Sequence, residues 1–198
     1  KSISQGYNID NTQDQAYIAA FGSAKKHIHI LTPNLNDDDA IKSLAEAVSR
    51  GVQVKLITTF GFNRSTENYP GQGGDNRKGY CRLYKASLKL TKDEKKVKNF
   101  LHLRWYTRPD GVRVDDSQSV VDDAGTGRPD AMHAKYATID NELAIVGTAN
   151  MDTQSWNHSR EINLAVDSKE VTIAWDKKLF TNVYKRSDLW EGPTSCKK

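Results

Sequence analysis

The sequence predicts an α/β fold in which a mixed, largely parallel β-sheet is flanked by helices on both faces. Short apolar runs alternate with amphipathic helical patterns along the first hundred residues, and strand–helix–strand order implies right-handed crossovers between parallel strands. The 198 residues, 37% hydrophobic and 27% charged, suit one domain with a substantial core, and no apolar run is long enough to cross a bilayer. We therefore expect residues 1–198 to form a single lobe.

The first half of the chain is expected to form a helix, a strand, a helix and a strand in turn. Thr12 and Gln15 make a capping box, which begins the first helix. The second helix begins in an acidic stretch, carries an apolar stripe at helical spacing and ends at Gly51. The expected elements are a helix over 12–25, a strand over 27–32, a helix over 36–50 and a strand over 52–59.

The second half is expected to continue with helices, a third strand and a hairpin. A Gly- and Asn-rich loop over 60–78 precedes two helical stretches, and a polar loop over 107–131 follows the third strand. Asp140-Asn141-Glu142 separates two apolar runs, and Asn and Asp tolerate the backbone of a tight turn. The expected elements are helices over 80–88 and 92–99, a strand over 101–106, hairpin strands over 136–140 and 143–147, a strand over 162–166 and a helix over 169–184.

Polar residues gather at the head of this hairpin. His133 and Lys135 are two residues apart, so their side chains fall on one face of the first strand. The hairpin folds Asn150, which lies just past the second strand, back beside them. An imidazole serves as a nucleophile or proton carrier near neutral pH, and a Lys with an Asn provides fixed donors for oxyanions. Such a set suits a phosphate ester, and Glu161 is a candidate to orient the imidazole.

These residues resemble the signature of the phospholipase D superfamily, His-x-Lys-x4-Asp-x6-Gly-(Ser/Thr)-x-Asn. The positions that match are His133, Lys135, Asp140, Gly147, Thr148 and Asn150. Residues 152–163 are similar to the C-terminal catalytic half of two-lobed phospholipase D-like proteins, and residues 32–36 and 72–76 also resemble that family. The resemblance implies the phospholipase D/nuclease-like fold.

The resemblance and the spacing together assign roles. The expected catalytic residues are His133, Lys135, Asp140, Asn150 and Glu161. The expected substrate-binding residues are Lys135, Thr148, Asn150 and Trp156. Asp140 is equally well explained as a turn residue, Glu161 as a plain strand-edge charge, and Trp156 as a core residue rather than a wall of the cleft. No metal site is expected, because His-x-Lys is not a pair of metal ligands.

The chain carries one copy of a motif that the family's active site needs twice. The other histidines lack a Lys and an Asp at the required distances. A second lobe is therefore expected, either from an identical chain across a twofold axis or from another polypeptide segment. The similarity around Trp156 favours a missing N-terminal half, and a start at Lys1 without Met fits a fragment or a processed chain.

The expected activity is that of a phospholipase D-type phosphodiesterase, which hydrolyses or transfers phospholipid head groups through a phosphohistidine intermediate without metal or cofactor. In two-lobed members the N-terminal histidine is usually the nucleophile, which by resemblance makes His133 the general acid. Two alternatives stay open. One is a metal-independent endonuclease of the same superfamily that acts on DNA or RNA, and the other is a non-catalytic lobe that binds phosphate-bearing ligands or serves in assembly.

Composition leaves the substrate and the compartment open. The formal net charge of +4 favours phosphate-rich partners but does not separate a lipid surface from nucleic acid. Cys81 and Cys196 are too few for a disulfide framework, and they form either one bridge or two free thiols.

Overall fold

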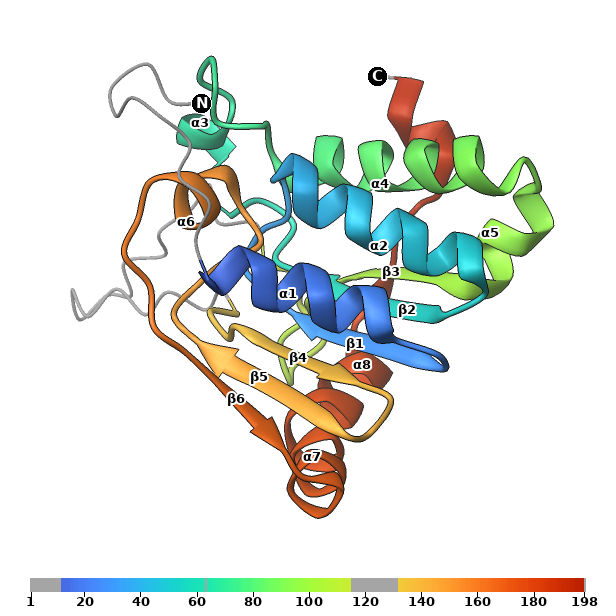
Figure 1. Cartoon of the computed structure of the whole chain (residues 1–198). Helices are drawn as coiled ribbons and strands as arrows, with labels where there is room; N and C mark the ends of the chain where they lie inside the picture. Colours follow the sequence, from blue (N-terminus) through green and yellow to red (C-terminus); the bar gives the residue numbers. More distant parts are fainter. Residues whose placement is uncertain (1–11, 63, 115–131, 198) are drawn as a thin grey trace.

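The computed structural model describes residues 12–62, 64–114 and 132–197 of the chain, so most of the polar loop expected over 107–131 lies outside the described residues. Within them, one seven-stranded sheet runs through the molecule (Figure 1). Its order is β6-β5-β4-β1-β2-β3-β7. The strands are β1 His27–Leu31, β2 Gln53–Thr58, β3 Leu101–Trp105, β4 Tyr136–Ile139, β5 Leu143–Gly147, β6 Asn163–Asp167 and β7 Asp188–Leu189.

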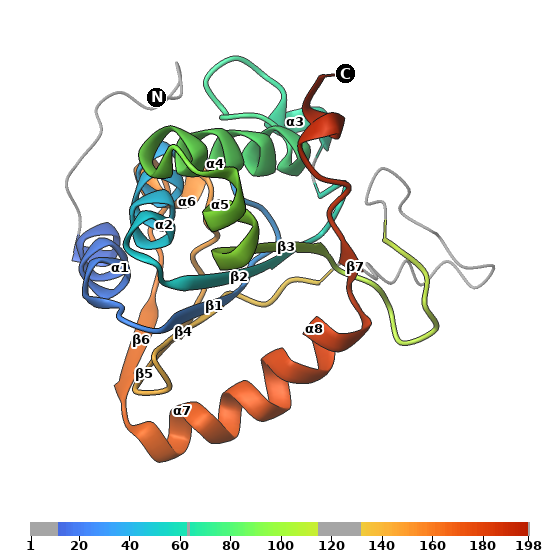
Figure 2. The same ribbon diagram turned by 90° about the vertical axis from the view of Figure 1, so that its right-hand side faces the viewer.

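Helices cover both faces of the sheet (Figure 2). One layer holds α1 Thr12–Ser23, α2 Asp38–Arg50, α4 Asn76–Thr91 and α5 Glu94–Phe100. The other is a continuous run of α7 Lys169–Trp175, the π-helix η1 Asp176–Thr181 and α8 Asn182–Arg186. Shorter helices are α3 Arg64–Glu67, α6 Thr153–Asn157 and the 3₁₀ helix η2 Pro193–Lys197. The mixed α/β class with helices on both faces is confirmed. No helix in the described ranges has the length and apolar character that a membrane crossing requires.

The sheet is less parallel than predicted. β1 pairs with β2, and β2 with β3, in the parallel sense expected of strand–helix–strand units. The other pairings, β1 with β4, β4 with β5, β5 with β6 and β3 with β7, are antiparallel. A tight turn joins β4 to β5, and a tight turn can connect only antiparallel strands. The prediction of a largely parallel sheet is wrong because it extended the pattern of the first three strands to the whole chain.

The end signals of α2 act as the sequence predicts. The side chain of Asp37 accepts hydrogen bonds from the backbone N–H groups of Asp39 and Ala40, which caps the N terminus. Gly51 ends the helix in the left-handed conformation, with a φ of 89°. Because α2 begins directly after the loop that follows β1, this cap fixes the path of residues 32–37 along one end of the sheet.

The main core lies between the sheet and the layer of α1, α2, α4 and α5. Helix α4 approaches the loop after β1 very closely, since a Cβ atom built on Gly79 would lie 1.9 Å from the carbonyl oxygen of Leu35. Asn76, in the first turn of α4, accepts from the backbone N–H of Leu35 at 2.8 Å and donates to the carbonyl of Pro33 at 2.8 Å. The loop that follows β1 is therefore held rigidly against α4.

A smaller core lies under the opposite face, where β1 meets η1. His29 Nδ1 lies 3.1 Å from both carboxylate oxygens of Asp176, and Thr138 donates to the same carboxylate at 2.9 Å. The Phe180 ring stacks on the imidazole with centroids 4.4 Å apart. Burial lowers the pKa of His29, although the neighbouring Asp176 opposes that shift. This polar pair joins the C-terminal helices to the middle of the sheet.

Candidate active site

The imidazole of His133 and the ammonium group of Lys135 meet just ahead of β4. Lys135 Nζ lies 2.7 Å from His133 Nδ1 and donates to the carbonyl oxygen of His133 at 2.8 Å. The Phe62 ring lies beside the imidazole, with centroids 5.6 Å apart. Burial lowers the pKa of Lys135, and the carboxylates of Glu161 and Asp152 oppose that shift. The ammonium group is thus partly dehydrated, and the two acids favour its charged form, which is the form that binds an oxyanion.

Asn150 is fixed by the N-cap of a short helix. Its Nδ2 donates to Asp152 Oδ2 at 3.0 Å, and its backbone N–H donates to Ser155 Oγ at 3.1 Å. Asp152 also caps α6, because its Oδ1 accepts from the backbone N–H of Ser155 at 2.7 Å. Since Asp152 acts on Lys135 as well, the loop after β5 and the segment before β4 converge on one carboxylate.

Glu161 joins the end of β5 to the start of β6. Its Oε2 accepts from Thr148 Oγ1 at 2.5 Å, and its Oε1 accepts from Ser155 Oγ at 2.9 Å. Thr148 Oγ1 also accepts from the backbone N–H of Ile162 at 3.0 Å. Glu161 therefore holds Thr148 and Ser155 while its charge acts on Lys135. Its role in orienting the imidazole of His133 stays a prediction, as does the binding of substrate by Thr148.

The motif has a glycine before Thr148 because the structure leaves no room for a side chain at Gly147. A Cβ atom at this position would lie 2.2 Å from Asn163 Oδ1 and 2.3 Å from the carbonyl oxygen of Ile162. Strands β5 and β6 can pair at this point only if the residue is glycine. This close approach brings Glu161 within hydrogen-bonding distance of Thr148.

Asp140 lies at the far end of β4 and holds backbone rather than substrate. Its Oδ2 accepts from the backbone N–H of Lys25, and its Oδ1 accepts from those of Lys26 and His27, each at 2.8 Å. Its φ of 56° belongs to the tight turn between β4 and β5. The whole length of β4 separates it from Lys135, so its assignment as a catalytic residue is corrected to a structural one.

Trp156 is also corrected, from a substrate-binding residue to a core residue. Only 1% of its surface is exposed, and its ring stacks on Tyr17 of α1 with centroids 5.8 Å apart. The short helix α6 turns this side chain inward, away from solvent. It therefore anchors the site-bearing loop to the core and does not wall a cleft.

Two residues that contact the candidate site, Asn34 and Glu67, were not predicted from the sequence to belong to it. Asn34, after β1, donates from Nδ2 to Asp152 Oδ2 at 2.8 Å and to Glu67 Oε1 at 3.2 Å. Asn34 belongs to the segment that resembles the family, so a signal for it existed. Glu67 comes from the Gly- and Asn-rich loop region, which carries no periodic pattern, and only the folded structure brings it here.

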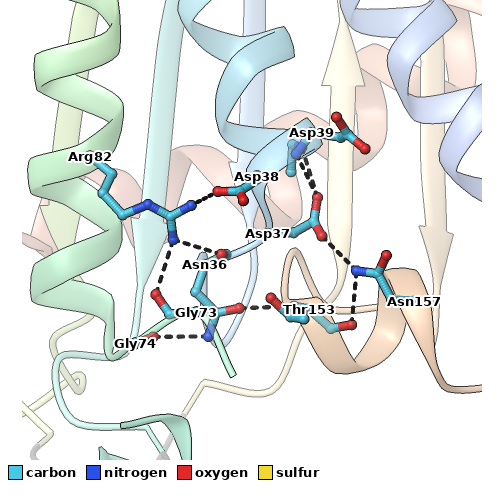
Figure 3. Close-up of polar contacts among 10 residues, drawn as sticks. Asn36, Asp37, Asp38, Asp39, Gly73, Gly74, Arg82, Thr153 and Asn157 are labelled. Carbon is cyan, nitrogen blue, oxygen red and sulfur yellow. Dashed lines mark hydrogen bonds and ion pairs between the residues drawn. The ribbon is translucent and has the colours of Figure 1, made fainter. Parts of the chain in front are cut away.

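A polar cavity of about 600 Å³ borders this network (Figure 3). Arg82 closes one side, since its guanidinium donates to the carbonyl oxygens of Asn36 and Gly73 and pairs with Asp38. On the other side the backbone N–H of Thr153 donates to Asn36 Oδ1 at 2.8 Å. The lining residues are thus engaged with one another, and they tie the loop over 71–74 to the N terminus of α2.

Similarity to known proteins indicates the family to which the chain belongs. The family model described as "Cardiolipin synthase, PLD-like domain" matches residues 17–182. The chain is 28% identical over 148 residues to Cardiolipin synthase 2 of Bacillus cereus, a match that covers 74% of this chain and 21% of that protein. The chain therefore spans about a fifth of the length of this curated relative.

Solved structures show the same fold. Nuc from Salmonella typhimurium, described as a phospholipase D family member, superposes with a TM-score of 0.58 and 14% identity over 89% of each chain. Phosphatidylserine synthase of Haemophilus influenzae gives a TM-score of 0.63 and 15% identity over 95% of this chain and 39% of that one. Because the family model covers most of its length, the chain belongs to the family of phospholipase D-like domains of the cardiolipin synthase type.

Proposed function

We propose that the chain is a catalytic lobe of a phospholipase D-type phosphodiesterase that hydrolyses or transfers phospholipid head groups. The observation that carries the proposal is the meeting of Lys135 Nζ and His133 Nδ1 at 2.7 Å, together with an Asp152 that both holds Asn150 and acts electrostatically on Lys135. The names of the curated relatives, cardiolipin synthases, support a phospholipid as the substrate class.

The proposed reaction has two steps, each an exchange at phosphorus. In the first, an imidazole nitrogen bonds to phosphorus, the bond to the leaving alcohol breaks, and a second imidazolium gives its proton to the departing alkoxide. In the second step, the imidazole that gave up its proton takes a proton from water or an acceptor alcohol. The oxygen of that molecule then attacks phosphorus, and the P–N bond breaks. Lys135 and Asn150 would bind the non-bridging oxygens and stabilise the added charge in the transition state. His133 is the proposed general acid.

The proposed reaction needs a second lobe, which we place against β6. This strand forms one edge of the sheet, and its neighbourhood exposes two apolar side chains, Ile162 at 81% and Leu164 at 58%. Exposed apolar residues at an edge strand mark a surface suited to association. Glu161 directly precedes this surface, so a lobe seated there would lie next to the site. The greater length of the curated relatives is consistent with a further lobe.

A side-by-side assay tests the proposal. The chain would be given phosphatidylcholine or phosphatidylglycerol vesicles and, separately, plasmid DNA, with its size in solution measured in the same buffer. With a second lobe present, as an identical chain or as an added segment, we expect phospholipid turnover that His133→Asn reduces by at least about a thousand-fold, as befits loss of a proton-transfer group. His102→Asn, a change at the start of β3, serves as the matched control and should leave turnover intact.

Each outcome has a distinct meaning. Turnover that persists in His133→Asn contradicts the proposed site. Cleavage of DNA alone, with a steep loss at high salt, favours the endonuclease instead. A monomer that is inactive until a second lobe is added supports a missing half, whereas an active dimer supports pairing of identical chains. A label from substrate trapped on His133 would make it the nucleophile and overturn its assignment as the acid.

A further inference from the structure

Two buried carboxyl groups, Glu67 and Asp152, lie behind Asn150. They share one amide group, because Asn34 Nδ2 donates to Glu67 Oε1 at 3.2 Å and to Asp152 Oδ2 at 2.8 Å. Asn36 Nδ2 donates to the other oxygen of Glu67 at 2.5 Å. All of these side chains are buried, with Glu67 8% exposed and Asp152 3% exposed. The carboxyl groups therefore sit close together in an environment with little water.

Such an arrangement makes the ionised state of Glu67 unfavourable. A buried carboxylate loses its hydration, and two negative charges that share a site repel each other. The hydrogen bonds from Asn34 and Asn36 offset this only in part. Burial, followed by the charge of Asp152, raises the pKa of Glu67 from 4.5 to about 7. Glu67 therefore gains and loses its proton in the neutral range, where few carboxyl groups titrate.

The charge on Glu67 reaches the candidate site through a short series of contacts. Asp152 accepts from Asn150 Nδ2 with the same oxygen, Oδ2, that accepts from Asn34. Asp152 also acts electrostatically on Lys135. A negative charge added at Glu67 increases the negative potential behind the two residues proposed to bind phosphate, and it competes for the amide of Asn34, which holds Asp152.

We propose that Glu67 is a positioning residue of this site, which by holding a proton keeps Asp152 and Asn150 in place and lets the site bind phosphate oxygens, and by releasing it weakens that binding. This rests on the proposed function, since it takes Asn150 and Lys135 as the groups that receive the phosphate. Glu67 touches neither the substrate nor the reacting atoms. It acts through Asn34 and Asp152.

The other charged groups around Glu67 define what the test must control. Asp152 faces it from the loop before α6, and beyond Asp152 lie Lys135 and Glu161. Asp75, next to the loop that contacts Glu67, is neutralised by Arg77 at 2.9 Å. His133 carries an ionisable imidazole of its own, so its contribution must be removed.

The experiment measures anion binding rather than turnover. Dimethyl phosphate, a diester whose charge does not change in this range, would be titrated into the full chain while the side-chain amide signal of Asn150 is followed by NMR. Both chains compared carry His133→Asn, and one also carries Glu67→Gln, which keeps the volume but cannot ionise. Glu142→Gln, an exposed change in the β4–β5 turn, is the matched control in the same background.

We expect the affinity of the chain that keeps Glu67 and carries only His133→Asn for dimethyl phosphate to fall about ten-fold between about pH 6 and about pH 8. This is the size expected for one charge added near the site but not in contact with the ligand. Glu67→Gln should remove this fall, and Glu142→Gln should preserve it. A fall of equal size in Glu67→Gln, or no binding at either pH, would overturn the inference.

A second measurement guards against a misfolded variant. The carboxyl carbon of Glu67 in the ¹³C-labelled unmutated chain should titrate near neutral pH, and Asp152→Asn should move that midpoint to lower pH by removing the neighbouring charge. A midpoint near the ordinary pKa of a glutamate overturns the inference. Failure of the proposed function is distinguishable, because a chain that turns over no diester but shows both effects would lose the activity and keep the role of Glu67.

Discussion

At the scale of single residues, Asp140 shows how a signature residue can serve the fold alone. Its carboxylate accepts three backbone N–H groups from residues 25–27, where α1 ends and β1 begins. These bonds lower the pKa of Asp140 in spite of partial burial. The residue also adopts a positive φ, which Asp and Asn tolerate better than most residues. One side chain thus fixes the start of the central strand.

Asp140→Asn should destabilise the protein by about 1–3 kcal/mol at neutral pH and leave the turnover of folded molecules unchanged. A carboxyl group with a lowered pKa stabilises the fold above its ordinary pKa, and that contribution is lost as the pH falls through the folded value. The difference between the two proteins should therefore shrink in acid. Urea unfolding at neutral and acidic pH measures it, with Asp167→Asn at the exposed end of β6 as the control. A loss of turnover without a loss of stability would restore Asp140 to the catalytic set.

The sequence predicts the individual chemistry of His133, Lys135 and Asn150 because their spacing and the hairpin are both local. It does not reveal the role of Glu67, which lies far along the chain from Asp152 and comes close to it in the fold, where both carboxyl groups accept from Asn34. The prediction that Trp156 binds substrate fails for a related reason. Whether an aromatic side chain faces solvent or core depends on the short helix that carries it. Residues defined by long-range contacts need the fold before they can be assigned.

At the scale of elements, the boundaries predicted from end signals and periodicity fall close to those observed for β1, α2 and the β4–β5 hairpin. The elements that escaped prediction are short. Strand β7 has two residues, and α6 has five, which is too few to show a period. The parallel character of the sheet was overestimated because strand direction depends on connections rather than on local pattern.

Gly147→Ala should separate β5 from β6, since the new methyl group would overlap Asn163 and the carbonyl of Ile162. We expect a loss of about 2–4 kcal/mol in unfolding free energy and a marked loss of turnover, because Thr148 and Glu161 would move apart. Gly22→Ala in α1 is the control, as a Cβ there meets nothing within 4 Å, and it should be neutral or slightly stabilising. Thermal unfolding and phospholipid turnover measure both variants. Equal behaviour of the two would contradict the close-packing argument.

The disulfide between Cys81 and Cys196 fastens η2 to α4 and settles the question left open by the sequence. The cysteines are 115 residues apart, so the bond closes a long loop in the unfolded chain. Its reduction should lower the unfolding free energy by about 2–4 kcal/mol. Denaturant curves with and without a reductant measure this. A chain with both Cys81→Ser and Cys196→Ser should have the stability of the reduced protein, and the reductant should not change it. If the reductant leaves the unfolding midpoint of the unmutated chain unchanged, the bond adds no stability.

At the scale of the whole molecule, both edges of the sheet expose apolar side chains, but it is the β6 edge that adjoins Glu161 of the candidate site. Ile162→Ser with Leu164→Ser should weaken association with a second lobe or copy and reduce turnover, because the apolar surface beside the site is lost. Leu189→Ser on β7, the opposite edge, is matched in exposure at 65% and should leave both properties intact. Sedimentation over a range of concentrations, combined with the turnover assay, measures the effect. Unaltered association in the double variant would move the proposed interface elsewhere.

The order of strands in the sheet also has a consequence for how the polypeptide is made. The three parallel strands come first in the chain, yet β4 covers the outer edge of β1 and β7 covers the outer edge of β3. During synthesis those two edges stay uncovered until the later segments emerge, and bare strand edges invite addition of strands from neighbouring molecules. A fragment that stops after β3 should therefore precipitate, and adding the remainder in trans should rescue it. The segment that carries His133 and continues into β4 thus has a second role, because it covers the edge of β1 and protects the earlier half of the chain from aggregation.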